Sequence, residues 1–388
     1  MQFTDFSKLD LSRLPSPCYV VDEVAVERNL RILRQVADAS GARVLAALKA
    51  FSMWRLAPLV ARYLDGTCSS GLHEAQLGSE YYGGEVHVFS AAYSESSLRE
   101  ILSLADHVVF NSCSQWQRFA PLIQAARAQR PGLEFGLRIN PEHSEGTVPL
   151  YDPCAPGSRL GIPLSQLDES TLEGISGLHF HTLCEQDFPP LQRTLDAVEA
   201  KFGHLLPRMK WVNFGGGHHI TRPGYQIDEL VARIKAFSGK YDVQVYLEPG
   251  EAVAIGTGVL VAEVLDVTWN QMQQAILDTS ATCHMPDILE MPYRPDIFGA
   301  GEADALAHSY RLGGLTCLAG DVIGDYSFDQ PLQVGQRLVF ADMAHYTMVK
   351  TSTFNGTQLP AIALWNSLTD ELEIVREFGY SDFRERLS

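Results

Sequence analysis

A single lysine in an otherwise apolar run is the residue of this sequence best suited to covalent chemistry. Lys49 stands in LAALKAF, where the neighbouring side chains are small or apolar. An ammonium group in such surroundings is costly to keep charged and unpaired, so we expect a lowered pKa or a covalent partner. Schiff-base formation with an aldehyde cofactor meets that requirement. The alternative is a lysine whose ammonium reaches solvent at the rim of the fold.

Four histidines stand in two short segments further along the chain. His179 and His181 alternate in HFHT, so their side chains share one face of a strand, and His181 is placed to stack on a flat heteroaromatic ring. The alternative is a histidine satisfied by hydrogen bonds within the core. His218 and His219 raise the question of metal, but no carboxylate stands at ligand spacing beside them, so we predict no metal site.

Three glycines and a glutamate supply two further parts of a cofactor site. Gly215, Gly216 and Gly217 follow a predicted strand in NFGGGHH, and they leave backbone N–H groups open to a phosphate. A plain tight turn is the alternative. Glu248, in YLEPG, ends a strand where a carboxylate is able to pair with a protonated pyridine nitrogen, or to form a structural ion pair instead. Lysine, histidine, glycine loop and glutamate together describe one cofactor cradle.

Eight short β-like runs alternate with helical segments between about residues 25 and 250. This alternation predicts an α/β fold in which parallel strands close into a (β/α)₈ barrel, with the active site at the carboxyl ends of the strands. The rival is an open doubly wound sheet, but the first strand lacks the GxGxxG turn of a dinucleotide fold. The predicted strands are 43–49, 67–70, 86–91, 107–111, 133–139, 175–182, 210–214 and 243–248, and the predicted helices include 24–38, 54–64, 95–105, 114–130 and 227–239.

The pattern changes after residue 255 to β-like runs without a long helical period. We therefore predict a second, mainly β domain, to which a short strand at 17–22 contributes. The predicted domains are a barrel over 24–255 and a β domain made of 1–23 and 256–388. The strands predicted after the barrel are 257–268, 274–278, 310–318, 337–349 and 361–366.

The composition restricts the partners and the compartment. With 46% hydrophobic and 20% charged residues the chain is typical of a globular protein, and its net charge of −17 argues against nucleic acid or an anionic membrane as partner. That charge is compatible with a cationic substrate. Seven cysteines without paired CxxC spacing suggest neither a disulfide framework nor a zinc knuckle. No membrane span or targeting segment is visible, so we expect a cytoplasmic protein.

With these residues identified, the chain resembles the fold-type III pyridoxal-phosphate decarboxylases, the group of eukaryotic ornithine and bacterial diaminopimelate decarboxylases. Within that group it is most similar to the carboxynorspermidine (carboxyspermidine) decarboxylases. The likeness runs over nearly the whole chain, and its motifs stand in the order of the family: ALKA, HFHTLCEQ, NFGGG, LEPGEA, CHMPD, EMPYRP, TCLAGD and HYTMVKTSTFNG.

The resemblance implies specific roles for residues of this sequence. Cys317, in TCLAGD, matches the cysteine that returns a proton to the substrate carbon after carbon dioxide leaves. In the family this cysteine comes from the neighbouring subunit, so the resemblance implies a homodimer with shared active sites. The implied contacts of pyridoxal 5′-phosphate are Lys49 as the Schiff-base lysine, His181 on the ring face, Gly215, Gly216, Gly217 and Tyr346 on the phosphate, and Glu248 on the pyridine nitrogen.

One departure from the wider family bears on the substrate. Ornithine and diaminopimelate decarboxylases usually read EPGR where this chain reads EPGE, so Glu251 replaces an arginine. A carboxylate at that point repels an acid group and attracts an amine. The resemblance places Glu251, Asp287 and Asp321 on the substrate, with salt bridges at the domain junction as the alternative. Arg294, in PYRP, is expected either to hold the departing carboxylate or to brace its loop.

The expected activity is therefore decarboxylation of carboxynorspermidine or carboxyspermidine, to norspermidine or spermidine, in polyamine biosynthesis. A diaminopimelate or other basic amino-acid decarboxylase is the rival within the class, and EPGE and CHMPD both count against it. A non-catalytic pyridoxal-phosphate-binding protein is the rival outside the class, but it would not need the β domain or Cys317. A zinc enzyme that uses His218 and His219 is a third alternative.

Overall fold

The computed structural model describes residues 4–146 and 148–388. The chain divides into two compact units. One, the barrel unit, spans Glu27–Val253, and the other, the sheet unit, combines Met1–Val26 with Ala254–Ser388. These junctions lie a few residues from the predicted ones, and residues 1–3 of the predicted β domain lie outside the described part of the chain.

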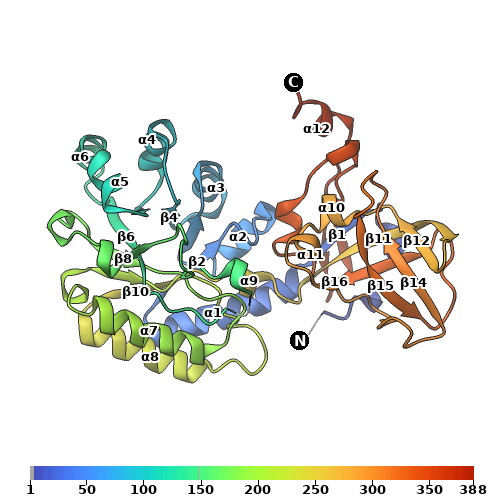
Figure 1. Cartoon of the computed structure of the whole chain (residues 1–388), viewed down its shortest axis with the longest axis horizontal. Coiled ribbons are helices and arrows are strands. Elements are labelled where there is room, and N and C mark those ends of the chain that lie inside the picture. Colours follow the sequence, from blue (N-terminus) through green and yellow to red (C-terminus); the bar gives the residue numbers. More distant parts are fainter. Residues whose placement is uncertain (1–3, 147) are drawn as a thin grey trace. The chain divides into compact units, whose positions relative to one another are not determined.

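Eight parallel strands close into a ring in the barrel unit (Figure 1). Pairing follows chain order from β2 to β10, and β10 pairs back onto β2, with Tyr246 opposite Arg43. The predicted (β/α)₈ barrel is confirmed, and the open doubly wound sheet is wrong. The strands are β2 (Arg43–Ala47), β3 (Gly66–Ser69), β4 (Glu85–Phe89), β5 (His107–Phe110), β6 (Glu134–Asn140), β8 (Gly177–His179), β9 (Trp211–Asn213) and β10 (Gln244–Leu247), and β7 (Ile162–Pro163) adds to β6.

Helices surround these strands on the outside of the ring (Figure 1). In α4 the buried side chains of Leu98, Ile101 and Leu102 recur at helical spacing, and the Ser94 hydroxyl accepts a hydrogen bond from the N–H of Ser97 at the helix start. No helix in the described chain combines the length and the apolar character needed to cross a membrane. The helices are α1 (Glu23–Ser40), α2 (Ala57–Val60), α3 (Leu72–Leu77), α4 (Glu95–Leu104), α5 (Cys113–Arg118), α6 (Ala120–Gln129), α7 (Phe188–Phe202) and α8 (Ile227–Tyr241).

Two predicted helices are wrong in their extent. The segment predicted as 54–64 contains a short 3₁₀ turn, Trp54–Leu56, and only one turn of α-helix. The segment predicted as 114–130 divides into α5 and α6 at Phe119. Proline explains the second break, because Pro121 lies in the first turn of α6, where its missing N–H group costs nothing, and it cannot lie in the middle of a longer helix without breaking it.

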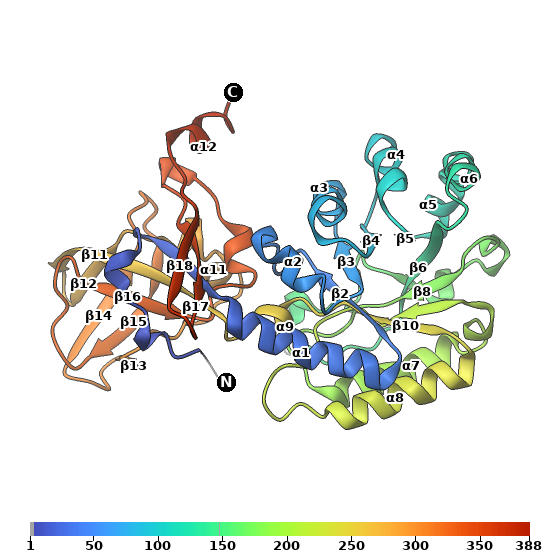
Figure 2. The same ribbon diagram turned by 180° about the vertical axis from the view of Figure 1, so that it is seen from behind.

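The sheet unit is built on one nine-stranded sheet, in the order β13-β15-β14-β12-β11-β1-β17-β18 with β16 also paired to β11. The N-terminal strand β1 lies between β11 and β17, antiparallel to the first and parallel to the second. The antiparallel pair β17 and β18 is seen side by side in Figure 2. The strands are β1 (Cys18–Asp22), β11 (Gly258–Trp269), β12 (Gln273–Leu277), β13 (Ala300–Gly301), β14 (His308–Gly313), β15 (Val322–Phe328), β16 (Arg337–Ala341), β17 (Ala361–Asn366) and β18 (Glu371–Arg376).

The predicted second, mainly β domain is confirmed, together with the contribution of segment 17–22. Two predicted strands, 310–318 and 337–349, end early, at Gly313 and Ala341, and β15 and β18 were not predicted. The chain turns after Gly313, where the N–H of Gly314 donates to the carbonyl of Asp321 and the N–H and hydroxyl of Thr316 donate to its carboxylate. Short helices α10 (Ala281–His284), α11 (Asp287–Glu290) and α12 (Tyr380–Arg384) complete the unit.

Candidate active site

Lys49 lies just beyond the carboxyl end of β2, in a turn whose backbone is fixed by its neighbours. The N–H groups of Ala47 and Leu48 donate to the carbonyls of Pro249 and Cys68, at 3.1 Å each. Leu48 and Ala50 are buried, but the Lys49 side chain is exposed. The prediction of an ammonium group enclosed by apolar neighbours is therefore wrong. The turn buries the residues on either side and directs the lysine amine to the mouth of the barrel.

His181 lies beside this amine, beyond the end of β8. Its Nε2 is 3.5 Å from the Nζ of Lys49, and its Nδ1 accepts a hydrogen bond from the N–H of Gly216 at 3.0 Å. Burial, followed by the positive charges of Lys49 and Arg138, holds the pKa of His181 well below its ordinary value. The ring is therefore neutral. Its Nδ1 also lies 3.1 Å from the carbonyl oxygen of Gly216, so the backbone of that one glycine fixes the orientation of the ring.

Glu248 follows β10 and lies in a closed hydrogen-bonding environment. Its Oε2 is 3.2 Å from the Nε2 of His179, and its Oε1 accepts from the Nδ2 of Asn213 at 2.8 Å. Burial opposes ionisation of this carboxyl, but the interactions with His179 and Asn213 outweigh burial and bring its pKa to about 2. Burial lowers the pKa of His179, and the neighbouring Glu248 carboxylate acts on that pKa in the opposite direction. Sequence reasoning missed Asn213, although it stands directly before the glycine loop.

The three glycines after β9 join these groups. Gly215 and Gly217 have φ angles of +69° and +83°, and a Cβ atom on Gly216 would lie 2.3 Å from the carbonyl oxygen of Glu248. Larger residues are therefore excluded from the loop. Two of the three N–H groups are engaged within the protein, since Gly215 donates to Asn213 Oδ1 at 2.8 Å and Gly216 donates to His181, so the phosphate contact of this loop stays a prediction.

These contacts make one continuous site. Lys49 contacts His181, His181 contacts Gly216, and Gly216 packs on the backbone of Glu248. A nucleophilic amine, a neutral imidazole, a loop without side chains and an anionic carboxylate thus converge at the mouth of the barrel. This donor set fits pyridoxal phosphate, which needs an amine for its aldehyde, space for its phosphate and an anion for its ring nitrogen.

Glu251 lies at the same end of the barrel, at the start of α9 (Glu251–Ala254). Its Oε2 is 3.0 Å from the Nε2 of His219, and Glu185 joins them in a cluster whose ligand atoms all lie within 4.8 Å of one another. No carboxylate stands at ligand spacing beside the histidine pair in the sequence, but two lie close to His219 in space, because spacing along the chain does not measure distance between loops that follow different strands. His218 is not in this cluster; its Nε2 lies 3.2 Å from the carbonyl oxygen of Gly215.

Within the sheet unit, Asp321 has a different role from the predicted one. It is 4% exposed, and its carboxylate accepts hydrogen bonds from the Ser280 hydroxyl, the N–H of Thr282, and both the N–H and the hydroxyl of Thr316. A carboxylate so occupied does not bind a substrate amine. Asp321 instead fixes the loop that presents Cys317, whose side chain is exposed and whose N–H donates to Asn355 Oδ1 at 2.9 Å.

The other predicted residues of the sheet unit are placed as follows. Asp287 forms an ion pair with Lys350, and the Nζ of Lys350 lies 5.9 Å from the ring centre of Tyr346. Tyr346 has a φ angle of +50° at the start of a 3₁₀ turn. Arg294 pairs with Glu302 and covers the ring of Tyr326 at 4.5 Å, so it braces its loop.

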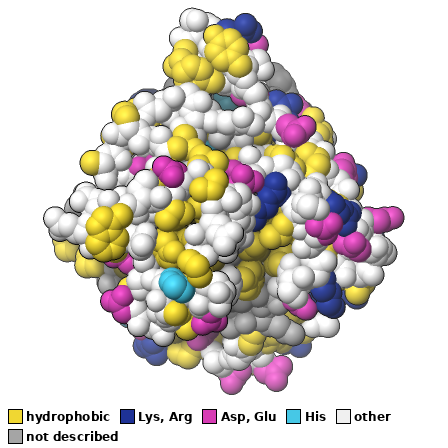
Figure 3. Space-filling model, turned by 90° about the vertical axis from the view of Figure 1, so that its right-hand side faces the viewer, with side chains coloured by type: hydrophobic (Ala, Val, Ile, Leu, Met, Phe, Trp, Pro, Cys, Tyr) yellow, Lys and Arg dark blue, Asp and Glu magenta, His cyan; other side chains and the backbone are white. Residues whose placement is uncertain are grey.

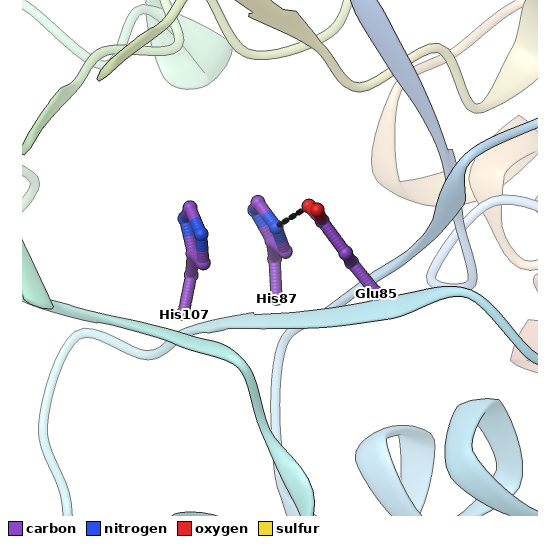
Figure 4. Close-up of side chains that lie close together, drawn as sticks. All are labelled: Glu85, His87 and His107. Carbon is purple, nitrogen blue, oxygen red and sulfur yellow. Dashed lines mark hydrogen bonds and ion pairs between the residues drawn. The ribbon is translucent and has the colours of Figure 1, made fainter. Parts of the chain in front are cut away.

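A second histidine cluster lies at the amino ends of β4 and β5 (Figure 4). Glu85 bonds to His87 at 2.9 Å, and the rings of His87 and His107 stack with centroids 3.9 Å apart and planes inclined by 17°. Two nearly parallel rings do not direct their lone pairs at one ion. Burial lowers the pKa of His87 to about 4 and that of His107 to about 2, so both rings are neutral packing residues.

Fold and site together define a barrel enzyme built around a covalently bound aldehyde cofactor. A family model described as "Pyridoxal-dependent decarboxylase, C-terminal sheet domain" matches residues 18–344. The chain belongs to the pyridoxal-dependent decarboxylase family. The predicted enzyme class, a pyridoxal-phosphate-dependent decarboxylase, and its cofactor are confirmed, and the non-catalytic binding protein is not supported.

Several curated relatives are similar over nearly their whole length. The chain is 44% identical to a carboxynorspermidine/carboxyspermidine decarboxylase of Campylobacter jejuni, covering 96% of this chain and 99% of the relative. It is also 44% identical to a carboxyaminopropylagmatine decarboxylase of Synechocystis, covering 97% and 96%. The crystal structure of the Campylobacter jejuni carboxynorspermidine decarboxylase with norspermidine superposes with a TM-score of 0.87 at 43% identity, covering 96% of this chain and all of that one. The resemblance seen in the motifs is confirmed.

Proposed function

We propose that this chain decarboxylates a carboxylated polyamine, carboxynorspermidine or carboxyspermidine, to form norspermidine or spermidine. The observation that carries the substrate class is Glu251, an acid held by His219 at the barrel mouth, where the wider family usually has arginine. A negative charge there favours a cationic chain and disfavours a second carboxylate, as in diaminopimelate. The relatives that are 44% identical act on substrates of this cationic kind.

The residues of the site would have separate roles in cofactor binding. When bound, pyridoxal phosphate supplies the electron sink for the electron pair that remains when carbon dioxide leaves. Lys49 would hold the cofactor through its amine, and the ionised Glu248 would keep a proton on the ring nitrogen. The neutral ring of His181 would lie against the cofactor ring without adding a charge that competes with it.

The remaining contacts follow from the family pattern. Gly215, Gly216 and Gly217 would leave space for the phosphate, with Tyr346 as a further phosphate contact. Asp287 would attract a distal amine of the substrate. The carbon that loses carbon dioxide would take its proton from the Cys317 thiol, which solvent then reprotonates, so that no oxidant or reductant is needed.

We also propose that the working enzyme is a homodimer in which Cys317 is supplied to the site of the partner subunit. Of the 17 exposed large hydrophobic side chains in the described chain, three (Trp54, Tyr81 and Tyr151) lie in the barrel unit and the other 14 in the sheet unit. Leu315 and Leu318, at 43% and 44% exposure, flank Cys317. Figure 3 shows a face on which hydrophobic side chains gather toward the middle between charged ones. Such exposure supports a protein interface.

The dimer proposal is tested by mixing two inactive variants, Lys49→Ala and Cys317→Ala. Shared sites would produce hybrids with one intact site, and random reassociation of equal amounts would restore about a quarter of the wild-type activity. A mixture that stays inactive after verified subunit exchange would contradict shared sites. We place the reaction in the cytoplasm, which the seven free cysteines support because disulfides are rare there.

The activity itself is tested by release of carbon dioxide from purified, cofactor-loaded protein. The proposal predicts turnover of carboxynorspermidine or carboxyspermidine with kcat/KM far above that for diaminopimelate, ornithine or lysine. Carboxyaminopropylagmatine is a second candidate substrate, because the Synechocystis relative is as similar to this chain as the Campylobacter one. A preference for diaminopimelate would refute the proposed substrate class.

A further inference from the structure

Three polar side chains from three different loops meet at the mouth of the barrel. Glu185 follows β8, His219 follows the glycine loop after β9, and Glu251 follows β10. One ligand atom from each lies within 4.8 Å of the others, and His219 Nε2 is 3.0 Å from Glu251 Oε2. We call Glu185, His219 and Glu251 the mouth cluster.

The mouth cluster is held by backbone pairing. Gln186 forms an isolated parallel bridge with His218, the N–H of Gln186 donates to the carbonyl of Gly217 at 3.0 Å, and the N–H of His219 donates to the carbonyl of Gln186 at 3.1 Å. These bonds extend the barrel sheet by one step beyond β8 and β9. His219 is 3% exposed and Glu185 is exposed. A buried imidazole therefore fixes Glu251, while Glu185 borders solvent.

The mouth cluster lies on the same loops as the residues around the cofactor lysine. Glu185 stands four residues after His181, whose Nε2 is 3.5 Å from the Nζ of Lys49. Glu251 stands three residues after Glu248, at the carboxyl end of β10. The two carboxylates are therefore placed for the distal part of a substrate rather than for its reacting end.

Two carboxylates this close repel each other, and a cation between them removes the repulsion. A dialkylammonium group offers one positive charge and two N–H donors on opposite sides of the chain, which is one donor for each carboxylate. A metal ion suits the mouth cluster less well, because the buried nitrogen of His219 that faces Glu251 is already hydrogen-bonded to it and Glu185 is open to solvent.

We propose that Glu185 and Glu251 form a two-carboxylate subsite for the secondary ammonium group of the substrate, and that His219 is the positioning residue that orients Glu251. This inference rests on the proposed function. It explains why substrates built on polyamines, whose chain is interrupted by a secondary nitrogen, fit this site better than lysine or ornithine, whose distal amine is primary. It adds Glu185 and His219 to the residues that determine specificity.

The test compares two probes by calorimetry on the cofactor-loaded protein: norspermidine, and the diaminoheptane in which a methylene replaces the central nitrogen. Wild type is expected to bind norspermidine at least about tenfold more tightly than the diaminoheptane, because only norspermidine has a charged nitrogen that donates hydrogen bonds to the two carboxylates. The ratio of the two affinities is the quantity compared between variants. In Glu185→Gln the ratio falls severalfold, and in the double variant Glu185→Gln/Glu251→Gln it approaches one. The exposed Glu95→Gln, on α4, is the matched control and keeps the wild-type ratio.

His219 is tested in the same assay. His219→Ala is expected to lower the norspermidine preference and to raise KM more than it lowers kcat, and His219→Gln, which retains a donor, restores part of the preference. A loss of folding alone would lower the affinity for both probes equally and would leave their ratio unchanged, so an unchanged ratio in folded His219→Ala overturns the positioning role.

Equal affinity of wild type for the two probes, or an unchanged ratio in folded Glu185→Gln, overturns the subsite. So does stoichiometric zinc in purified wild type that is lost in Glu185→Gln. These results are distinguishable from failure of the proposed function, because wild type would still release carbon dioxide from carboxynorspermidine. Absence of that turnover would instead refute the function on which the subsite depends.

Discussion

Replacement of Glu248 by glutamine removes the anion that the site places opposite the cofactor ring, while it keeps the size of the side chain. The pKa of this carboxyl is about 2, against an ordinary value of 4.5, because its hydrogen-bonding partners His179 and Asn213 outweigh burial. The difference corresponds to ~3 kcal/mol of preference for the charged form. The side chain is only 14% exposed, so solvent screens little of this energy.

The charged carboxylate would keep the ring nitrogen protonated, so the loss of that charge is expected to add up to ~3 kcal/mol to the barrier, which corresponds to a fall in kcat of about 100-fold. The assay is carbon dioxide release at saturating substrate, with cofactor occupancy measured on the same sample. Glu95→Gln is the control, because it removes an exposed carboxylate on α4. A kcat within about threefold of wild type, at full occupancy, would refute the assignment of Glu248 to the ring nitrogen.

Three further predictions concern the framework of the site. Gly216→Ala is expected to weaken cofactor binding and to destabilise the fold by about 1–3 kcal/mol, measured by cofactor titration and urea unfolding, because its Cβ would lie 2.3 Å from the Glu248 carbonyl oxygen. Asp321→Asn is expected to cost about 1–3 kcal/mol of unfolding free energy, because it removes the charged acceptor shared by Ser280 and Thr316, and to lower kcat through Cys317. His87 has a pKa of about 4 in the folded protein, against an ordinary value of 6.5. The stability that its neutral form contributes is therefore fully present above pH 6.5 and is lost as the pH falls toward 4. His87→Phe is expected to make the unfolding free energy less dependent on pH between these values, and an unchanged pH dependence would contradict the buried neutral ring.

Sequence predicted the barrel well because parallel strands covered on both faces read as short apolar runs. All eight predicted strands overlap observed ones, and the residues at their carboxyl ends, Lys49, His181, Gly216 and Glu248, converge as expected. The barrel itself explains this success: once strand order is known, the ends of neighbouring strands must meet at one mouth.

The errors have local causes. Strand β15, VIGDYSF, has glycine and aspartate inside it, and β18, ELEIVR, alternates charged residues at an exposed edge, so neither reads as a strand. Exposure of Lys49 could not be predicted from its apolar neighbours, because alternate residues of a turn point in different directions. Asp321 was predicted to bind the substrate because of the motif in which it stands. Its burial, and the hydroxyl and N–H groups that donate to its carboxylate, can be seen only in the folded structure.

Contacts between loops were the least predictable feature of the site. His219 and Glu251 are separated by 32 positions and Glu185 precedes both, so no local pattern joins them. Asn213 was the one missed residue with a local signal, because an asparagine two residues before a positive-φ glycine commonly accepts from its N–H group, as the Gly215 bond shows.

The central claim is that one lysine at the barrel mouth carries the aldehyde cofactor. The most direct measurement is mass spectrometry of peptides from the holoenzyme after borohydride reduction, which fixes the cofactor to the residue that binds it. The account predicts a pyridoxyl-phosphate mass on the peptide that contains Lys49 and none in Lys49→Ala, together with loss of turnover in that variant. Label on a different lysine, or full turnover in Lys49→Ala, would contradict it.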